Sequence, residues 1–205
     1  YSLEAVDLQG CVGEDAVLVT VQNVSENDRI CLVTVDTVVW KNKIIWEPTP
    51  DMGTAVTYIY KEVLTGIYNW IGQVSAGSTS SFIDMSSNPE SHSDRYKISV
   101  RDTCNAMSDQ SPYHNTMNLV VSAFGSTMGL VWTPYTTEDN SFTPAEYYIY
   151  RGTSPDNLQL LTSVSGNQNT YNDVNVFTLY YYLISAQRDC NIAPAFSNRC
   201  DNGLT

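Results

Sequence analysis

The sequence repeats one pattern of aromatic and polar residues twice. Trp46, two residues before Pro48, is matched by Trp132, two residues before Pro134. Further matches join Tyr58–Lys61 to Tyr148–Arg151, Phe82–Asp84 to Tyr171–Asp173, and Tyr96–Cys104 to Tyr182–Cys190. The outermost matches share one offset along the chain and the inner ones drift by a few residues, as loop-length changes in a duplicated domain produce. Two copies of one small domain are therefore expected.

Length and composition agree with a pair of small β-domains. Two domains of roughly 90 residues each, large enough for one hydrophobic core, account for most of the chain. The 205 residues are 42% hydrophobic and only 16% charged, and fourteen are tyrosine. This composition is typical of an ordered extracellular β-protein and differs from that of a disordered segment.

The charge of the chain argues against two classes of partner. A formal net charge of −12 with scattered Lys and Arg would repel a nucleic-acid backbone and an anionic membrane surface. No apolar run is long enough to cross a bilayer, so no membrane insertion is expected. The expected partners are neighbouring domains of the same polypeptide, with surface proteins or glycans as further candidates.

Short alternating runs between polar turns predict strands, and no stretch shows helical periodicity. The strands expected in the first copy are residues 30–35, 43–47, 56–60, 68–72, 81–84, 96–100 and 108–114. Those expected in the second are 117–121, 130–132, 147–150, 158–162, 170–173, 180–186 and 195–200. Residues 151–157, rich in turn-forming residues, are expected to be a long hairpin connection. The predicted fold class is all-β, with immunoglobulin-like two-layer sandwiches at residues 28–115 and 116–205.

Residues 1–26 lie outside both copies and are expected to form a β-hairpin. Its strands are predicted at residues 1–7 and 15–21, joined by residues 9–13. The hairpin looks like the end of an upstream immunoglobulin-like or PKD-like domain. Because an isolated hairpin is marginally stable in water, it is expected to lean on the next domain or to depend on sequence elsewhere. The start at Tyr1 without a signal segment suggests a piece of a longer exported precursor.

The strand motifs resemble those of fibronectin type III domains over about residues 28–205. They are the Trp of the second strand, the Tyr-x-Ile-Tyr-Arg pattern ending at Arg151, and the sixth-strand patterns that begin at Tyr96 and Tyr182. Segments 30–36, 96–104, 111–114 and 150–155 further resemble a tandem pair in large secreted or surface proteins of Bacteroidetes-type bacteria. Many of these proteins carry a sorting domain for type IX secretion, absent here, and are associated with gliding motility or adhesion. This chain departs from the pattern at Asn105, where Gly is expected, although Asn tolerates a left-handed turn.

The resemblance implies core residues and a cell-surface location. Trp46 and Trp132 are expected to fill the two cores, and Tyr96 and Tyr182 match the packed tyrosine of the family's sixth strand, whose hydroxyl needs a partner. The expected location is secreted, at the bacterial cell surface. The triplet containing Thr37 resembles an O-glycosylation signal of Bacteroidetes secreted proteins, with Thr37 as the acceptor.

The five cysteines are expected to form disulfides in an oxidising compartment, because none forms a Cys-x-x-Cys pair or lies near a His in the sequence. In the fibronectin type III arrangement Cys31 and Cys104 would lie at the same pole, which implies a bond between them. Cys190 takes the place of Cys104 in the second copy, and Cys200 is its nearest alternative partner. Cys11 is the candidate for an unpaired thiol.

Candidate catalytic and metal-binding groups are few. The two histidines, His92 and His114, lack a neighbouring glycine elbow around a serine, so no catalytic triad is predicted. Residues Glu90, His92 and Asp94 alternate, but such a pattern in a loop is commoner than a metal site. The pairs at residues 14–15 and 138–139 lack the spaced carboxylates of a calcium loop and favour solubility. The chain is predicted to be no enzyme and to have no catalytic, cofactor or metal site.

Several aromatic residues leave a binding function open. Those not obviously in a core are Trp40, Trp70, Tyr113, Tyr135, Tyr147 and Tyr181. A cluster of them on one face would suit stacking on sugar rings or a protein interface, whereas strand-face aromatics that shield cross-strand neighbours are the favoured interpretation. The predicted function is therefore a non-catalytic structural spacer that presents its neighbours at the cell surface. The alternatives are an adhesion or carbohydrate-binding module, and the accessory region of a larger secreted enzyme.

Overall fold

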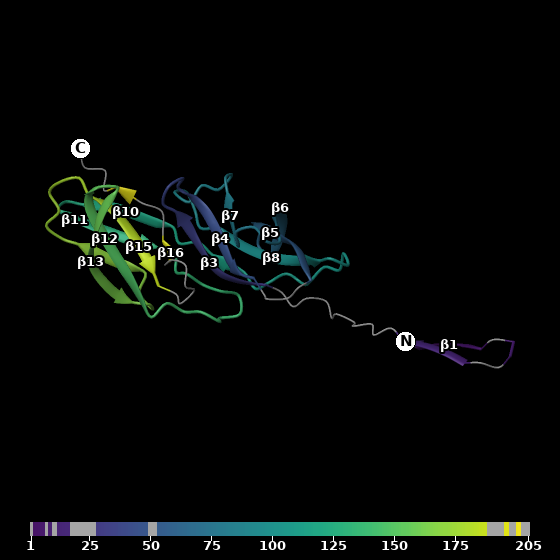
Figure 1. The fold of residues 1–205 in the computed structure, drawn as a ribbon. Coiled ribbons are helices and arrows are strands. Elements are labelled where there is room, and N and C mark those ends of the chain that lie inside the picture. Colours follow the sequence, from purple (N-terminus) through teal and green to yellow (C-terminus); the bar gives the residue numbers. More distant parts are fainter. Residues whose placement is uncertain are drawn as a thin grey trace.

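The computed structural model describes residues 2–6, 8–9, 12–16, 28–48, 53–187, 195–196 and 200–201, and every regular element in them is a β-strand. Figure 1 shows two β-sandwiches beside each other and a separate two-stranded hairpin. The all-β fold class with two tandem sandwiches, predicted from the repeated pattern, is confirmed. No helix in the described residues is long and apolar enough to span a membrane.

The first sandwich has two layers. One sheet contains β3 (Arg29–Asp36), β4 (Lys41–Glu47) and β7 (Ser81–Asp84), in that order. The other contains β6 (Ile67–Ser75), β5 (Thr54–Leu64), β8 (Arg95–Asp102) and β9 (His114–Asn115). All pairings are antiparallel, and successive residues of each strand point to opposite faces of its sheet.

The second sandwich repeats this order. Its first sheet contains β10 (Leu119–Phe124), β11 (Thr127–Trp132) and β14 (Thr170–Asp173). Its second contains β13 (Asn157–Ser165), β12 (Glu146–Ser154), β15 (Tyr181–Ala186) and β16 (Ala195–Phe196), and β17 (Cys200–Asp201) also pairs with β15. The matching strand order means that equivalent positions of the two modules can be compared residue by residue.

The interior of each sandwich is filled by the expected aromatic residues. Trp46 and Tyr96 belong to the core of the first module, with Ile44, Ile59 and Ile98 around them. Trp132 and Tyr182 belong to the second core, and all four aromatic side chains are nearly fully buried. Burial of such large side chains contributes several kcal/mol to each module.

The strand expected at residues 108–114 differs from the structure for a local reason. Residues 108–113 are not a regular strand, because the Ser108 and Ser111 hydroxyls accept the β8 amide hydrogens of Val100 and Ile98 that a strand carbonyl would otherwise accept. Of residues 108–115, only the last two, which form β9, pair with β8 as a regular strand. Asn105 has φ of +66°, so the prediction that Asn takes a left-handed turn position is confirmed.

The expected long connection at residues 151–157 is instead mostly strand. Arg151 pairs with Gln159 and Ser154 with Asn157, with a bulge between these pairs. The bulge brings the Asn157 carbonyl so close to Gly152 that a Cβ would have no room there. Turn-forming residues therefore mark a bulged ladder here, and the turn itself contains only Pro155 and Asp156.

The N-terminal hairpin is present, but its second strand is placed differently. β1 (Ser2–Val6) pairs with β2 (Val12–Ala16), with Val6 opposite Val12. The prediction of a strand at residues 15–21 was wrong for its start, because pairing close to the turn closes the shorter loop. Val6, Leu8 and Val12 are exposed, and Figure 1 shows β1 apart from both sandwiches. Residues 17–21 of the predicted second strand lie outside the described residues, and support of the hairpin by the next domain stays a prediction.

Candidate functional site: the junction between the sandwiches

The chain passes from the first sandwich to the second through a buried segment. Residues 114–119, called the junction segment here, are all buried. The segment begins as β9, which pairs with β8 of the first module, and reaches β10 of the second module after three intervening residues. Because the connection is short and buried, it restricts movement of one sandwich relative to the other and does not act as a flexible linker.

Asn115 binds the second module with both ends of its amide. Its Oδ1 accepts hydrogen bonds from the Thr136 amide at 2.5 Å and the Thr136 hydroxyl at 3.0 Å. Its Nδ2 donates to the Pro134 carbonyl at 2.9 Å. One side chain at the end of the first sandwich thus fixes the loop that follows β11.

Thr116 and Asn118 bind back to the first module. The Thr116 amide donates to the Asp94 carbonyl at 2.9 Å, and the Thr116 hydroxyl accepts from the Asp94 amide at 2.9 Å. The Ser93 hydroxyl donates to the Thr116 carbonyl, and Asn118 Nδ2 donates to the Pro89 carbonyl at 2.8 Å. The junction segment is therefore hydrogen-bonded to both sandwiches along its length.

Tyr135 lies at the centre of the contact. Its hydroxyl accepts a hydrogen bond from the Val33 amide of the edge strand β3 at 3.0 Å and lies 2.9 Å from His114 Nδ1. Its own amide donates to the Tyr147 hydroxyl at 3.0 Å, and its ring packs edge-on against Phe142. Tyr135 joins the edge of the first module, the junction segment and the second core, a role that the sequence left open.

Apolar side chains of the first sandwich are buried in the hydrophobic cluster of the second. Cys31, Leu32 and Ile45 belong to the cluster that contains Met117, Trp132 and Tyr135. They lie on the outer face of the sheet formed by β3, β4 and β7, and β16 lies beside β3. The two modules therefore share a continuous apolar contact, which stabilises their relative orientation.

An ion pair closes the polar rim of the junction. Lys97 Nζ lies 2.6 Å from Glu138 Oε2, and Tyr113 and Glu138 exchange two more hydrogen bonds near 3.0 Å. Burial opposes ionisation of Glu138, but hydrogen bonds from Lys97 and the Tyr113 amide outweigh it and hold the pKa of Glu138 below its usual range. The pair is partly exposed, so its role is to orient the rim more than to stabilise the fold.

Each sandwich also contains a buried polar cluster at the matching position. In the first, Asp84 accepts hydrogen bonds from Lys61 at 3.1 Å and from the Tyr96 hydroxyl at 2.8 Å. In the second, Asp173 accepts from Arg151 at 2.7 Å and from the Tyr182 hydroxyl at 2.8 Å. The repeat already aligned these residues, so the shared charge pattern was a signal that the sequence contained.

The first cluster is larger than the second. Asp94 adds a second carboxylate 2.9 Å from Lys61 Nζ, and Asn42 donates to Asp94 at 2.7 Å and to the Tyr96 hydroxyl at 2.9 Å. Burial opposes ionisation of Asp84, yet hydrogen bonds from Ser86, Tyr96 and Lys61 lower its pKa. Burial and the two carboxylates raise the pKa of Tyr96. The charged and polar groups of this cluster are buried, and they form ion pairs and hydrogen bonds with one another.

The candidate catalytic and metal-binding residues have structural contacts. His92 is exposed and its Nε2 lies 3.1 Å from Asp94 Oδ1, while its Nδ1 faces the Ser91 hydroxyl. The Ser91 hydroxyl also lies 3.0 Å from the Asn88 carbonyl, so both Ser91 and His92 have hydrogen-bond partners within the loop. Glu90 is exposed, and within the described residues no three His, Cys, Asp or Glu side chains are placed to hold a metal ion.

The candidate binding aromatics differ in burial and lie on different elements of the two sandwiches. Tyr135 and Tyr147, whose burial the sequence left open, are buried because the loop after β11 folds back over β12. Trp40, Tyr113 and Tyr181 are half-buried, and Trp70 on the edge strand β6 is 57% exposed.

The predicted bond between Cys31 and Cys104 is wrong. Cys104 is an exposed free thiol in the turn after β8, whereas Cys31 is engaged in a disulfide whose other sulfur lies outside the described residues. Cys31 is the bulged residue of β3 and is buried against the second sandwich, so it faces away from the turn that carries Cys104. Cys11, Cys190 and the side chain of Cys200 lie outside the described residues, and the bond between Cys190 and Cys200 stays a prediction.

Thr37 is exposed in the turn between β3 and β4. The Asp36 carboxylate accepts hydrogen bonds from the Val38 and Val39 amides and so holds this turn in place. The threonine hydroxyl is accessible to a modifying enzyme, and its glycosylation stays a prediction.

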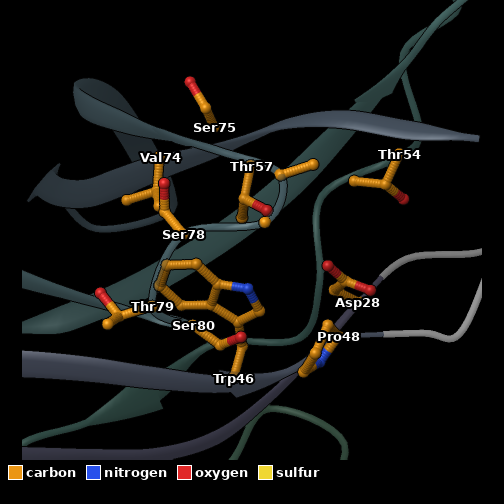
Figure 2. A pocket seen from close by; sticks show the side chains of 12 residues that line it. Asp28, Trp46, Pro48, Thr54, Thr57, Val74, Ser75, Ser78, Thr79 and Ser80 are labelled. Atoms are coloured by element: carbon orange, nitrogen blue, oxygen red, sulfur yellow. The ribbon is translucent and has the colours of Figure 1, made fainter.

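A cavity of about 250 Å³ opens at the end of the first sandwich, lined by Trp46, Asp28 and Pro48. Figure 2 shows the Trp46 indole at its base, with hydroxyl-bearing side chains around it. These are Thr54, Thr57, Ser75, Ser78, Thr79 and Ser80. The indole is nearly fully buried, so its face is not open for stacking on a sugar ring.

Comparison with known proteins yields distant structural likenesses. No protein-family model matches the chain, and no curated protein matches it in sequence. The FN1–FN3 domains of chicken CNTN1 cover 97% of this chain and 75% of their own, at 14% identity and a TM-score of 0.35. The chicken interferon gamma receptor alpha chain covers 85% of this chain and 96% of its own, at 12% identity and a TM-score of 0.32.

A third likeness is to the central fibronectin-III array of RIM-binding protein, which covers 86% of this chain and 61% of its own. The identity is 11% and the TM-score 0.35. Such values are too low to transfer a function. The fibronectin type III-like character of the modules rests on their own strand order.

Proposed function

We propose that this chain is a non-catalytic spacer that holds the neighbouring modules of one polypeptide at a fixed orientation. The observation that carries the proposal is the junction segment, which is buried over residues 114–119 and hydrogen-bonded to both sandwiches. A spacer of this kind transmits orientation because rotation at the junction would expose Leu32 and Ile45 and break the Tyr135 contacts.

The proposed setting is outside a bacterial cell, on an exported surface protein. The disulfide at Cys31 supports an oxidising compartment, and the low charge and tyrosine-rich composition suit an extracellular β-module. Labelling of intact source cells with a membrane-impermeant thiol reagent tests this setting at the exposed Cys104. Modification of Cys104 only after cell lysis would contradict a surface location.

Residual dipolar couplings of the two sandwiches test the spacer function directly. In a rigid spacer both modules report one alignment tensor, and independent tensors for the native chain would refute the proposal. The test variant is Asn115→Ala combined with Tyr135→Phe, which removes hydrogen bonds across the junction and leaves both cores in place. It is expected to give two different tensors.

The matched control is Tyr147→Phe. It removes a buried tyrosine hydroxyl that accepts the Tyr135 amide, a bond inside the second sandwich. The control is expected to lower stability while the two modules keep one tensor. This difference would separate loss of the junction from general loosening of the second module.

Adhesion is a second candidate function, favoured by the tip of the β5–β6 hairpin. Trp70, Val63, Leu64 and Ile67 are exposed there, and an exposed indole suits contact with a sugar ring or a protein. A glycan array of the whole chain, with Trp70→Ala as the comparison, tests this function. Binding that requires Trp70 would support adhesion, and a chain that acts only as a spacer would bind nothing.

A further inference from the structure

The outer face of β10, β11 and β14 in the second sandwich carries exposed apolar side chains. Val120 pairs with Val131 across the two strands, and these residues are 53% and 49% exposed. Phe124 is 72% exposed, and its ring lies 3.5 Å from the position that a Cβ of Gly129 would occupy. Three apolar side chains on one short sheet form a continuous patch, called the outer patch here.

The equivalent residues of the first sandwich are covered. Val131 and Ile45 each precede the core tryptophan, and their cross-strand partners are Val120 and Leu32. Leu32 is 0% exposed and Ile45 is 4% exposed, because the second sandwich packs on them. The same position of the same sheet is thus a docking surface in one module and open in the other.

The charges around the outer patch restrict what can cover it. The remaining residues of this face are Ser122, Thr127, Gly129, Thr170 and Asn172, none of which is charged. The chain as a whole has a net charge of −12, so two copies repel each other over most of their surface. The outer patch is a place where two copies can approach without opposing carboxylates.

We propose that the outer patch docks a second copy of this chain, which meets it with the same patch across a twofold axis. In the first sandwich, Leu32 and Ile45 are covered by parts of the second sandwich that include Tyr135 and the neighbourhood of β16. These parts are already engaged within their own chain. A second copy therefore offers another apolar surface, and an uncharged patch is complementary to itself in a twofold arrangement. Sheet-on-sheet packing of this kind buries the valines and Phe124 of both copies.

The association is weak and depends on concentration. Three strands of this length cover roughly 15 Å by 20 Å, or roughly 300 Å² per copy. Stable complexes bury about 800 Å² per partner. Because like charges oppose the encounter, added salt strengthens the association, which is the opposite of its effect on an ion-paired interface.

Sedimentation equilibrium of the whole chain, up to about 1 mM protein, tests the proposal. The native chain is expected to show a monomer–dimer equilibrium that tightens between about 20 and 300 mM NaCl. Val131→Glu places two carboxylates opposite each other and is expected to weaken association at least tenfold. A native chain that remains monomeric throughout, or a Val131→Glu variant that associates normally, overturns the proposal.

Two further variants make the result specific to this face. Leu160→Glu is the matched control, because Leu160 is equally exposed on the edge strand β13 of the same module. It is expected to leave association unchanged, and an equal loss in this control would contradict the assignment.

An equimolar mixture of Val131→Glu and Val131→Lys copies is expected to recover the dimer, and a mixture that stays monomeric would exclude the twofold face-to-face arrangement. Circular dichroism of each variant verifies that the fold is retained.

Discussion

The two sandwiches have the same strand order but differ in what covers them and in what is buried inside them. In the first, Leu32 and Ile45 are hidden by the second module, whereas the matching Val120 and Val131 remain open. In the first, Lys61 contacts two carboxylates, whereas Arg151 of the second is paired with Asp173. The duplicated sequence therefore preserves the apolar core, whereas the buried polar cluster and the contact with a neighbouring module differ between the two copies.

The largest expected effect comes from removing the buried cation of each cluster. Lys61→Met leaves Asp84 and Asp94 buried and facing each other without their cation, which is expected to destabilise the first sandwich by about 3–5 kcal/mol. Arg151→Met leaves one carboxylate and is expected to cost less. Hydrogen exchange of amides assigned to each module measures both, and equal losses would show that Asp94 adds nothing to the first cluster.

Acid is expected to weaken the first cluster through Asp84. The pKa of Asp84 is lowered in the folded chain from a usual value near 3.8, so its stabilisation is complete above that value and is lost as the pH falls through the lower folded value. The loss is expected to be about 1.5–3 kcal/mol, as for hydrogen bonds to a charged group. Urea unfolding of the native chain and of Asp84→Asn at pH 7 and below 3.8 measures it. Parallel pH profiles for the two chains would contradict the prediction.

At the junction, Tyr135→Phe is expected to destabilise the chain by about 1–3 kcal/mol, because the buried Val33 amide loses its acceptor. Rapid exchange of the Val33 amide hydrogen should accompany the loss. In Tyr147→Phe the amide of Tyr135 is the one that exchanges faster, while Val33 stays protected. Unchanged protection of Val33 in Tyr135→Phe would show that another group satisfies this amide.

Changes at the rim should have the smallest effects. Glu138→Gln breaks the pair with Lys97, and because Glu138 is 45% exposed at its side chain, the loss is expected to be about 0.5 kcal/mol or less and to shrink with salt. Urea unfolding at two salt concentrations measures it. A loss above about 1 kcal/mol would mean that the rim holds the junction more strongly than its exposure suggests.

Much of the fold was predictable, because it depends on local alternation and on the repeat. Apolar residues at every second position predicted the strands around Trp132 and Tyr96, and the repeat predicted the matching strands around Trp46 and Tyr182. The predictions were wrong where side chains replace backbone partners, as at residues 108–113, or where a bulge lengthens a ladder, as at Gly152. These features depend on the neighbouring strand, which a single stretch of sequence does not contain.

The candidate site was much less predictable than the fold. Tyr135 and Asn115 carry no signal in the sequence, because their partners lie in other segments of the chain or across the junction. The pairing of Cys31 with Cys104 was wrong for the same reason, since the bulge at Cys31 turns its side chain toward the second module. The residues of the two polar clusters were easier to find in the sequence, because the repeat aligned Lys61 with Arg151 and Asp84 with Asp173.

The sequence by itself determined the number of modules, their β-strands, their core tryptophans and tyrosines, and the acidic, weakly charged surface. These properties follow from periodicity and composition, which are local. Only the tertiary structure decided which outer face is covered, which tyrosine joins the modules and that Cys104 is exposed. The physical reason is that burial of an outward-facing residue such as Ile45 or Val131 depends on a second module placed against it, and two nearly identical strands can differ completely in this respect.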